Sequence, residues 1–234
     1  MKLMTFNTQH CMNYITREID FEIMAKAIRE QNPDIVGLNE MRNVGVKEDY
    51  TDQVKNLSVL SGMPHYYFAQ AIAFEGKNPY GNGMLSKIPF ETVETVMIPD
   101  PIEKPGNRWY ETRCILKATF ANGLTVLATH FGLNDDEQQN AVKTILKNIT
   151  PEKCIVMGDL NVRPDNPLLD PIRACMQDTA KAFKAPLLSF PSDNPHCKID
   201  YIFATPDIEI VSADIPAVVA SDHRPHIAEI RFNK

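Results

Sequence analysis

The sequence lacks the features that mark secreted and membrane proteins. Its five cysteines are scattered and form no CxxC pair, which argues against a disulfide framework and favours reduced thiols. No apolar run approaches the length needed to span a bilayer. The first residues, MKLMTFNT, pass directly into strand-like alternation without the apolar core of a signal peptide. We therefore expect a cytoplasmic protein with no transmembrane segment.

The sequence also has fewer basic than acidic residues. Lysine and arginine total 24 against 30 acidic residues, which gives a net charge of −6 and a pI near 5.5. Tight non-specific binding to nucleic acid needs a basic face, so this balance disfavours a nucleic-acid substrate, although a local basic patch is compatible with it. The main basic concentration is the sparse set Lys181, Lys184 and Lys198, which a solvated face explains equally well.

The composition is that of an ordinary globular protein, with 44% hydrophobic and 23% charged residues among 234. We expect one domain over residues 1–234, because no repeat or linker interrupts the chain. Apolar spacing predicts helices over residues 20–31, 51–60 and 135–148. The Asn-Gly pair within residues 112–130 predicts a hairpin. Helices that interrupt a chain dominated by hairpins favour a sheet-on-sheet core with helices packed outside.

Polar side chains recur where buried strands end. Charged groups next to so many apolar runs carry a desolvation cost unless they meet each other or an ion. In the segment IVMGDLNV, the two polar residues are two positions apart on an extended chain and so point the same way. The residues in this pattern are Asn7, Glu40, His130, Asp159, Asn161, Asp200, Asp222 and His223.

Three members of this pattern offer oxygen ligands for a metal. Asn7, Glu40 and Asp222 suit Mg²⁺, with Mn²⁺ as a substitute, and do not suit Zn²⁺. The two histidines are not spaced as a zinc pair and no cysteine accompanies them. Mg²⁺ is usually held by one or two carboxylates together with substrate phosphate. The sequence therefore indicates a phosphoester substrate.

Seven short motifs occur in order over essentially the whole chain: MTFN, IVGLNE, GNGMLSKIP, ATHFG, GDLNVRP, KIDYIFA and SDHRP. Each is weak alone, but together they resemble the endonuclease/exonuclease/phosphatase (deoxyribonuclease I-like) superfamily. The resemblance implies a four-layered α/β/β/α sandwich, in which two packed mixed β-sheets are flanked by helices. It also implies Mg²⁺-dependent hydrolysis of a phosphoester by in-line attack of water.

The resemblance implies a role for each matching position. Asp159 would orient or deprotonate the water, Asn161 would hold a phosphate oxygen, and Asp200 would pair with His223. His130 matches a histidine of the phosphodiesterase and phosphatase branches. Glu40 is the expected principal metal ligand, supported by Asn7 and Asp222. Substrate contacts with weaker support are Asn82, Arg113, His10 and Trp109. Two departures stand out: Asn39 replaces a usual glutamine, and an arginine often present after His130 is missing.

The substrate stays open at this stage. A small-molecule or lipid-headgroup phosphoester fits the acidic chain and the presence of His130. A DNA endonuclease, exonuclease or abasic-site repair nuclease fits the superfamily but lacks a basic stripe. A non-catalytic binding module is the third alternative, disfavoured because all the expected acidic and histidine positions are present. No obligate protein partner is indicated.

Overall fold

The computed structural model describes residues 1–232 as two six-stranded mixed sheets packed face to face. Sheet one has the order β11-β12-β1-β2-β4-β3, and sheet two the order β5-β6-β7-β8-β10-β9. The strands of sheet one are β1 (Lys2–Asn7), β2 (Ile35–Arg42), β3 (His65–Phe74), β4 (Asn78–Ser86), β11 (Ile208–Asp214) and β12 (His226–Phe232). Those of sheet two are β5 (Thr92–Met97), β6 (Cys114–Thr119), β7 (Thr125–His130), β8 (Cys154–Asp159), β9 (Gln177–Asp178) and β10 (Asp200–Ala204).

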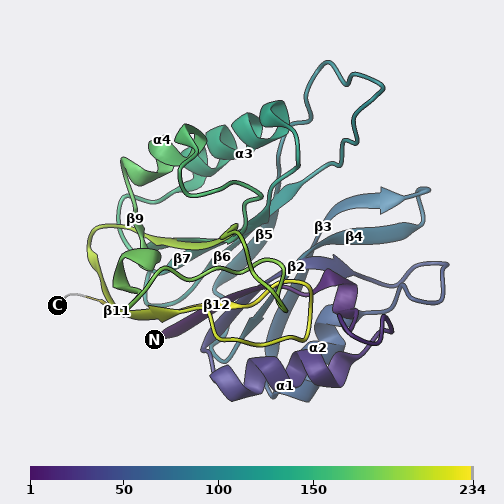
Figure 1. The fold of residues 1–234 in the computed structure, drawn as a ribbon, viewed down its shortest axis with the longest axis horizontal. Coiled ribbons are helices and arrows are strands. Elements are labelled where there is room, and N and C mark those ends of the chain that lie inside the picture. Colours follow the sequence, from purple (N-terminus) through teal and green to yellow (C-terminus); the bar gives the residue numbers. More distant parts are fainter. Residues whose placement is uncertain (233–234) are drawn as a thin grey trace.

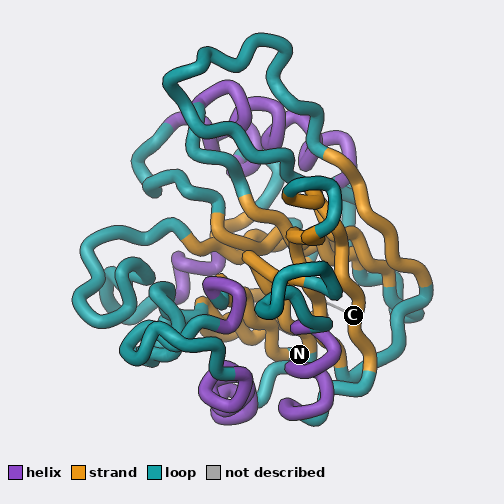
Figure 2. The backbone as a smooth tube through the Cα atoms, turned by 90° about the vertical axis from the view of Figure 1, so that its right-hand side faces the viewer, coloured by secondary structure: helices purple, strands orange, loops and turns teal. Residues whose placement is uncertain are grey.

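Helices cover the outer face of each sheet (Figure 1). α1 (Phe21–Gln31) and α2 (Gln53–Ser61) pack on sheet one, and α3 (Asp135–Asn148) and α4 (Asp170–Arg173) on sheet two. Three short 3₁₀ helices are η1 (Gln9–Cys11), η2 (Pro167–Leu169) and η3 (Thr179–Ala182). Figure 2 shows the strand layers between helices, end-on. The predicted four-layered sandwich is confirmed. Within the described residues, no helix is long and apolar enough to cross a bilayer.

The alternation of side chains along each strand builds three apolar layers. Leu3 and Met157 belong to the layer between the two sheets. Met4 faces the opposite way, toward α1 and α2, and Val156 faces α3. Strands buried on both faces must be apolar throughout, which is why these runs show no polar alternation until they end.

The register of the strands brings the polar ends together. His130 pairs with Asp159 across β7 and β8, and Asp159 pairs with Asp200 across β8 and β10. In sheet one, Asn7 lies opposite Asn39. Gly158 permits the close approach of β7, since a Cβ there would lie 1.8 Å from the Thr129 carbonyl oxygen.

Glu40 interrupts the alternation of β2. Its φ of 60° lies in the left-handed region, and the register with β4 shifts between Leu38 and Met41. In a regular strand Asn39 and Glu40 would face opposite sides of the sheet. This bulge, which is strained for a residue with a Cβ, lets both side chains reach the same group of polar residues.

Candidate active site

Asp159 lies at the centre of a cluster built from both sheets. Its Oδ2 accepts a hydrogen bond from Asn7 Nδ2 at 3.1 Å. The same oxygen lies 3.4 Å from His130 Nε2 and 3.5 Å from His223 Nε2. Its Oδ1 accepts from the Asn161 backbone N–H at 2.9 Å. The structure thus brings four other predicted site residues around the buried Asp159 carboxylate.

His223 is held between two carboxylates. Its Nδ1 lies 2.8 Å from Asp200 Oδ2, and the Phe190 ring packs 4.7 Å from the imidazole. Burial lowers the pKa of His223, but the charges of Asp200 and Asp159 outweigh it and raise the pKa to about 10. The ring is therefore an imidazolium at neutral pH, with a proton on each nitrogen.

The Asp159–His223–Asp200 cluster has ligand atoms arranged as a metal site could have them. Its ligand atoms lie within 4.8 Å of one another, which is compact enough for a cation. A doubly protonated imidazole would offer no lone pair to a metal, however, and its single positive charge offsets one of the two carboxylates. Burial raises the pKa of Asp159 to about 7, against the opposing charge of His223. Such a carboxylate is suited to accepting a proton near neutral pH.

Arg113 fixes the protonation of His130. Arg113 Nη1 lies 2.9 Å from His130 Nδ1, and a guanidinium can only donate. His130 Nδ1 must therefore accept, so the proton of the neutral ring is on Nε2, where it faces Asp159. Asn161 Nδ2 lies 3.1 Å from that nitrogen but has its own acceptor, the Phe131 carbonyl at 3.1 Å. Burial, with the Arg113 charge second, holds the pKa of His130 well below its usual range.

A second group of oxygens lies beside Asp159, on the other side of the Asn7 amide. Glu40 Oε1 accepts from Asn7 Nδ2 at 3.0 Å, and its Oε2 lies 3.4 Å from His10 Nδ1. The Glu40 side chain is 21% exposed. Burial raises its pKa, and the nearby charge of Asp222 adds to that effect. A partly exposed carboxylate whose pKa is raised by burial and by a nearby carboxylate fits a hard divalent cation, which would relieve the repulsion.

Asn7 and Asn39 act here through hydrogen bonds between strands. The amide nitrogen of Asn7 joins Glu40 to Asp159, while its Oδ1 accepts from the Gln9 backbone N–H at 3.1 Å. These contacts favour a positioning role for Asn7 over direct ligation, which stays a prediction. Asn39 accepts from the Asp159 backbone N–H at 2.9 Å and donates to Asn82 Oδ1 at 2.9 Å. Asn39, which replaces the usual glutamine, therefore has hydrogen-bond partners for both its amide oxygen and its amide nitrogen.

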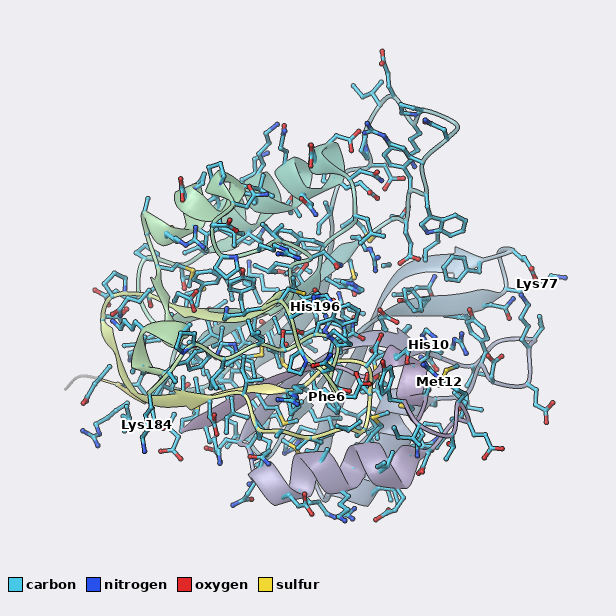
Figure 3. The ribbon with its side chains drawn as sticks, in the orientation of Figure 1. Phe6, His10, Met12, Lys77, Lys184 and His196 are labelled. Atoms are coloured by element: carbon cyan, nitrogen blue, oxygen red, sulfur yellow. The ribbon has the colours of Figure 1, made fainter. Side chains whose placement is uncertain are left out.

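Of the four weaker predictions, Arg113 contacts His130, and the other three fall in different places. Asn82 is buried, and its amide donates to the Cys114 carbonyl while its oxygen accepts from Asn39, so its placement argues against substrate contact. Trp109 is 68% exposed. The loop is held through the Trp109 carbonyl, which accepts from Asn134 Nδ2 at 2.7 Å, and the Trp109 side chain lies within hydrogen-bonding reach of Glu111. His10 (Figure 3) lies beside Glu40, and burial lowers its pKa to about 4.

Sequence reasoning missed two residues that support the site. Glu111 Oε1 lies 2.7 Å from Arg113 Nη1 and helps to hold the guanidinium against His130. The spacing Glu-x-Arg was a usable signal, because side chains two apart on an extended chain share a face. Phe190, which packs on His223, lies in an irregular loop and gave no such signal.

The two-sheet sandwich with an acidic and histidine site at the strand ends defines the class of this protein. A model of the Endonuclease/Exonuclease/phosphatase family matches residues 4–223. The chain belongs to that family, whose members hydrolyse phosphoester bonds. No curated protein matches the chain.

Several solved structures share the fold. An endonuclease/exonuclease/phosphatase from Beutenbergia cavernae is 23% identical with a TM-score of 0.81, over 99% of this chain and 71% of that one. A mannosyl-6-phosphatase from Bacteroides thetaiotaomicron is 14% identical with a TM-score of 0.77, over 99% and 100%. A humanized D. rerio TDP2 is 16% identical with a TM-score of 0.67, over 99% of each chain.

Proposed function

We propose that this protein is a Mg²⁺-dependent phosphoester hydrolase that acts on a small-molecule or lipid-headgroup phosphoester by in-line attack of water. One observation carries the proposal: a carboxylate with a pKa near 7 lies between an imidazolium and a neutral histidine N–H. Phosphoryl transfer to water needs a proton acceptor for the nucleophile and donors for the phosphoryl oxygens. The cluster supplies both within one site.

The protonation state of each residue determines its proposed role in the reaction. Asp159 takes a proton from the attacking water, since its pKa lies close to working pH. His223 donates to a phosphoryl oxygen as an imidazolium, and Asp200 keeps it charged and oriented. His130 donates through Nε2 as a neutral ring. It is therefore not a proton-transfer acid, because Arg113 opposes the imidazolium form.

Glu40 and Asp222 would hold the cation, with Asn7 orienting the Glu40 carboxylate. When bound, Mg²⁺ supplies charge stabilisation at the phosphoryl and leaving oxygens. A phosphomonoester of a sugar is one form of the proposed substrate, and the name of the mannosyl-6-phosphatase neighbour is consistent with it. The acidic net charge disfavours a nucleic-acid substrate.

The test is hydrolysis of bis-p-nitrophenyl phosphate and of p-nitrophenyl phosphate by the purified chain with Mg²⁺. We expect release of nitrophenol from at least one of them, abolished by EDTA and by Asp159→Asn. Preference for the second compound identifies a monoesterase. Nicking of plasmid or abasic duplex at rates far above both would instead identify a nuclease. No hydrolysis of any of these, with the fold intact by circular dichroism, would refute the proposed activity.

A further inference from the structure

His226, the first residue of β12, is a buried histidine with no part in the chemistry proposed above. Ala228, two residues further along β12, belongs to the apolar layer between the two sheets. Side chains two apart in a strand share a face, so the ring of His226 points from sheet one toward sheet two. There its Nδ1 lies 3.2 Å from the backbone carbonyl oxygen of Asp200.

The two partners of His226 fix its tautomer. A carbonyl oxygen can only accept, so Nδ1 carries the proton and donates it to Asp200. Nε2 is then an acceptor, and it lies 3.1 Å from the hydroxyl of the buried Thr179. Burial lowers the pKa of His226 well below its usual range, and the charge of Lys198 adds to that effect. The ring is therefore a neutral donor with one defined orientation. Lys198 is itself only 6% exposed, so the solvated-face interpretation is wrong for that lysine.

The register of sheet two explains why the Asp200 carbonyl needs a side-chain donor. Asp200 lies opposite Asp159, and in the next pair the Leu160 backbone N–H donates to the Ile199 carbonyl at 2.9 Å. Hydrogen-bonded and non-hydrogen-bonded pairs alternate in an antiparallel ladder, so the backbone groups of Asp200 point away from β8. β9, the strand on that side, pairs only with the last two residues of β10 and then gives way to η3. No strand therefore reaches the Asp200 carbonyl.

Side chains take the place of that strand. His226 donates to the Asp200 carbonyl, and the Asp200 backbone N–H donates to Ser189 Oγ at 3.4 Å. The Asp200 carboxylate has less support: its Oδ2 lies 2.8 Å from His223 Nδ1, and its Oδ1 has no hydrogen-bond partner among residues 1–232. The position of the carboxylate therefore depends on how firmly the backbone of Asp200 is held.

One short segment contacts Asp200 at two points, since His223 bonds its carboxylate and His226, three residues later, bonds its carbonyl. We propose that His226 is a positioning residue for the hydrolysis. By holding the Asp200 backbone, it keeps the Asp200 carboxylate against His223 Nδ1 and so keeps His223 aimed at the phosphoryl oxygen. This inference rests on the proposed function, in which His223 is the donor to that oxygen.

Two amide variants separate the two ring nitrogens of His226. Asparagine places its amide nitrogen near the position of Nδ1, so His226→Asn keeps the donor to the Asp200 carbonyl. Glutamine reaches the position of Nε2, so His226→Gln keeps a partner for Thr179 and loses that donor. Displacing a catalytic group by about 1 Å can slow a reaction about a hundredfold. For the better of the two nitrophenyl esters, we expect His226→Gln to lower kcat at least about tenfold with KM little changed. His226→Asn should retain most of the wild-type kcat.

The proton on His223 Nδ1 provides a readout that needs neither turnover nor metal. Charge-assisted hydrogen bonds are short and strong, and a proton in such a bond resonates downfield of the backbone amides. We expect this signal in the proton NMR spectrum of the wild type in EDTA, assigned by its loss in His223→Gln. His226→Asn should keep the signal at its wild-type position. His226→Gln should shift it upfield or lose it to exchange with water.

Ser58→Ala is the control for lost stability. The buried Ser58 hydroxyl donates to the Met63 carbonyl at 2.7 Å in a part of sheet one that does not contact Asp200. Its removal should lower the urea midpoint and leave kcat unchanged. Should His226→Gln fail to fold, Thr179→Val removes the hydroxyl that orients the ring, and we expect it to lower kcat and shift the His223 signal in the same direction.

Two results would overturn the proposal. One is a folded His226→Gln that has a lowered urea midpoint but keeps the wild-type kcat and His223 signal, since His226 would then act on stability alone. The other is an equal loss of kcat in the asparagine and glutamine variants when circular dichroism shows that both are folded. Either result leaves hydrolysis by the wild type standing, whereas an inactive wild type refutes the proposed function itself.

Discussion

Asp200→Asn should remove the charge that keeps His223 protonated while preserving the shape of the site. Raising the pKa of His223 from 6.5 to about 10 corresponds to about 5 kcal/mol in favour of the folded imidazolium, at about 1.36 kcal/mol per pKa unit. The rise of the Asp159 pKa from 3.8 to about 7 costs about 4 kcal/mol once that group ionises. The charge of Asp200 raises both pKa values, so Asp200→Asn should lower both.

The sign of the pH dependence follows from the raised folded pKa of His223. Its contribution is fully present below pH 6.5 and is lost as pH rises toward 10. Between pH 7 and 9 this should lower the free energy of unfolding of the wild type by about 2 kcal/mol. In Asp200→Asn, burial outweighs the remaining charge and that decline should largely disappear. Lys198, whose pKa burial lowers to about 8 against the charges of Asp178 and Asp200, acts oppositely, and loss of the Asp200 charge strengthens that opposite effect in the variant.

Urea denaturation at the two pH values measures this difference. The pH profile of kcat/KM provides a second readout, because activity that needs the imidazolium falls as His223 loses its proton. In the wild type this fall should lie near pH 10, and in Asp200→Asn it should move to lower pH. An unchanged alkaline limb together with an unchanged stability difference would refute the assignment of His223 as an imidazolium maintained by Asp200.

Three further changes test other parts of the site. Asp159→Asn should lower kcat by orders of magnitude with little change in the urea midpoint, because it removes the proton acceptor; near-full turnover would contradict that role. Glu40→Ala should raise the Mg²⁺ concentration needed for half-maximal activity, and an unchanged metal titration would remove Glu40 from the cation site. Arg113→Met should let His130 sample the other tautomer and bind protons more readily, seen in its ¹⁵N chemical shifts. Wild-type shifts would show that Arg113 does not set the tautomer.

The sequence by itself determined the sandwich and most of the acidic and histidine cluster. Apolar runs without polar alternation required strands buried on both faces, and their ends marked where polar groups begin. His130, Asp159 and Asp200 each continue the inward-facing alternation of an apolar strand. Residues on one face of neighbouring strands meet once the register is set, so their convergence follows from a local pattern.

Only the tertiary structure decided how these groups are paired and protonated. The left-handed backbone at Glu40 is imposed by a bulge against β4, which no local preference of glutamate favours. The tautomer of His130 depends on Arg113, a residue of another strand. Lys198 resembles any surface lysine in the sequence, and it is buried because β9, η3 and the segment before β10 close around it. Contacts between distant segments set desolvation and charge, and these are what fix a pKa.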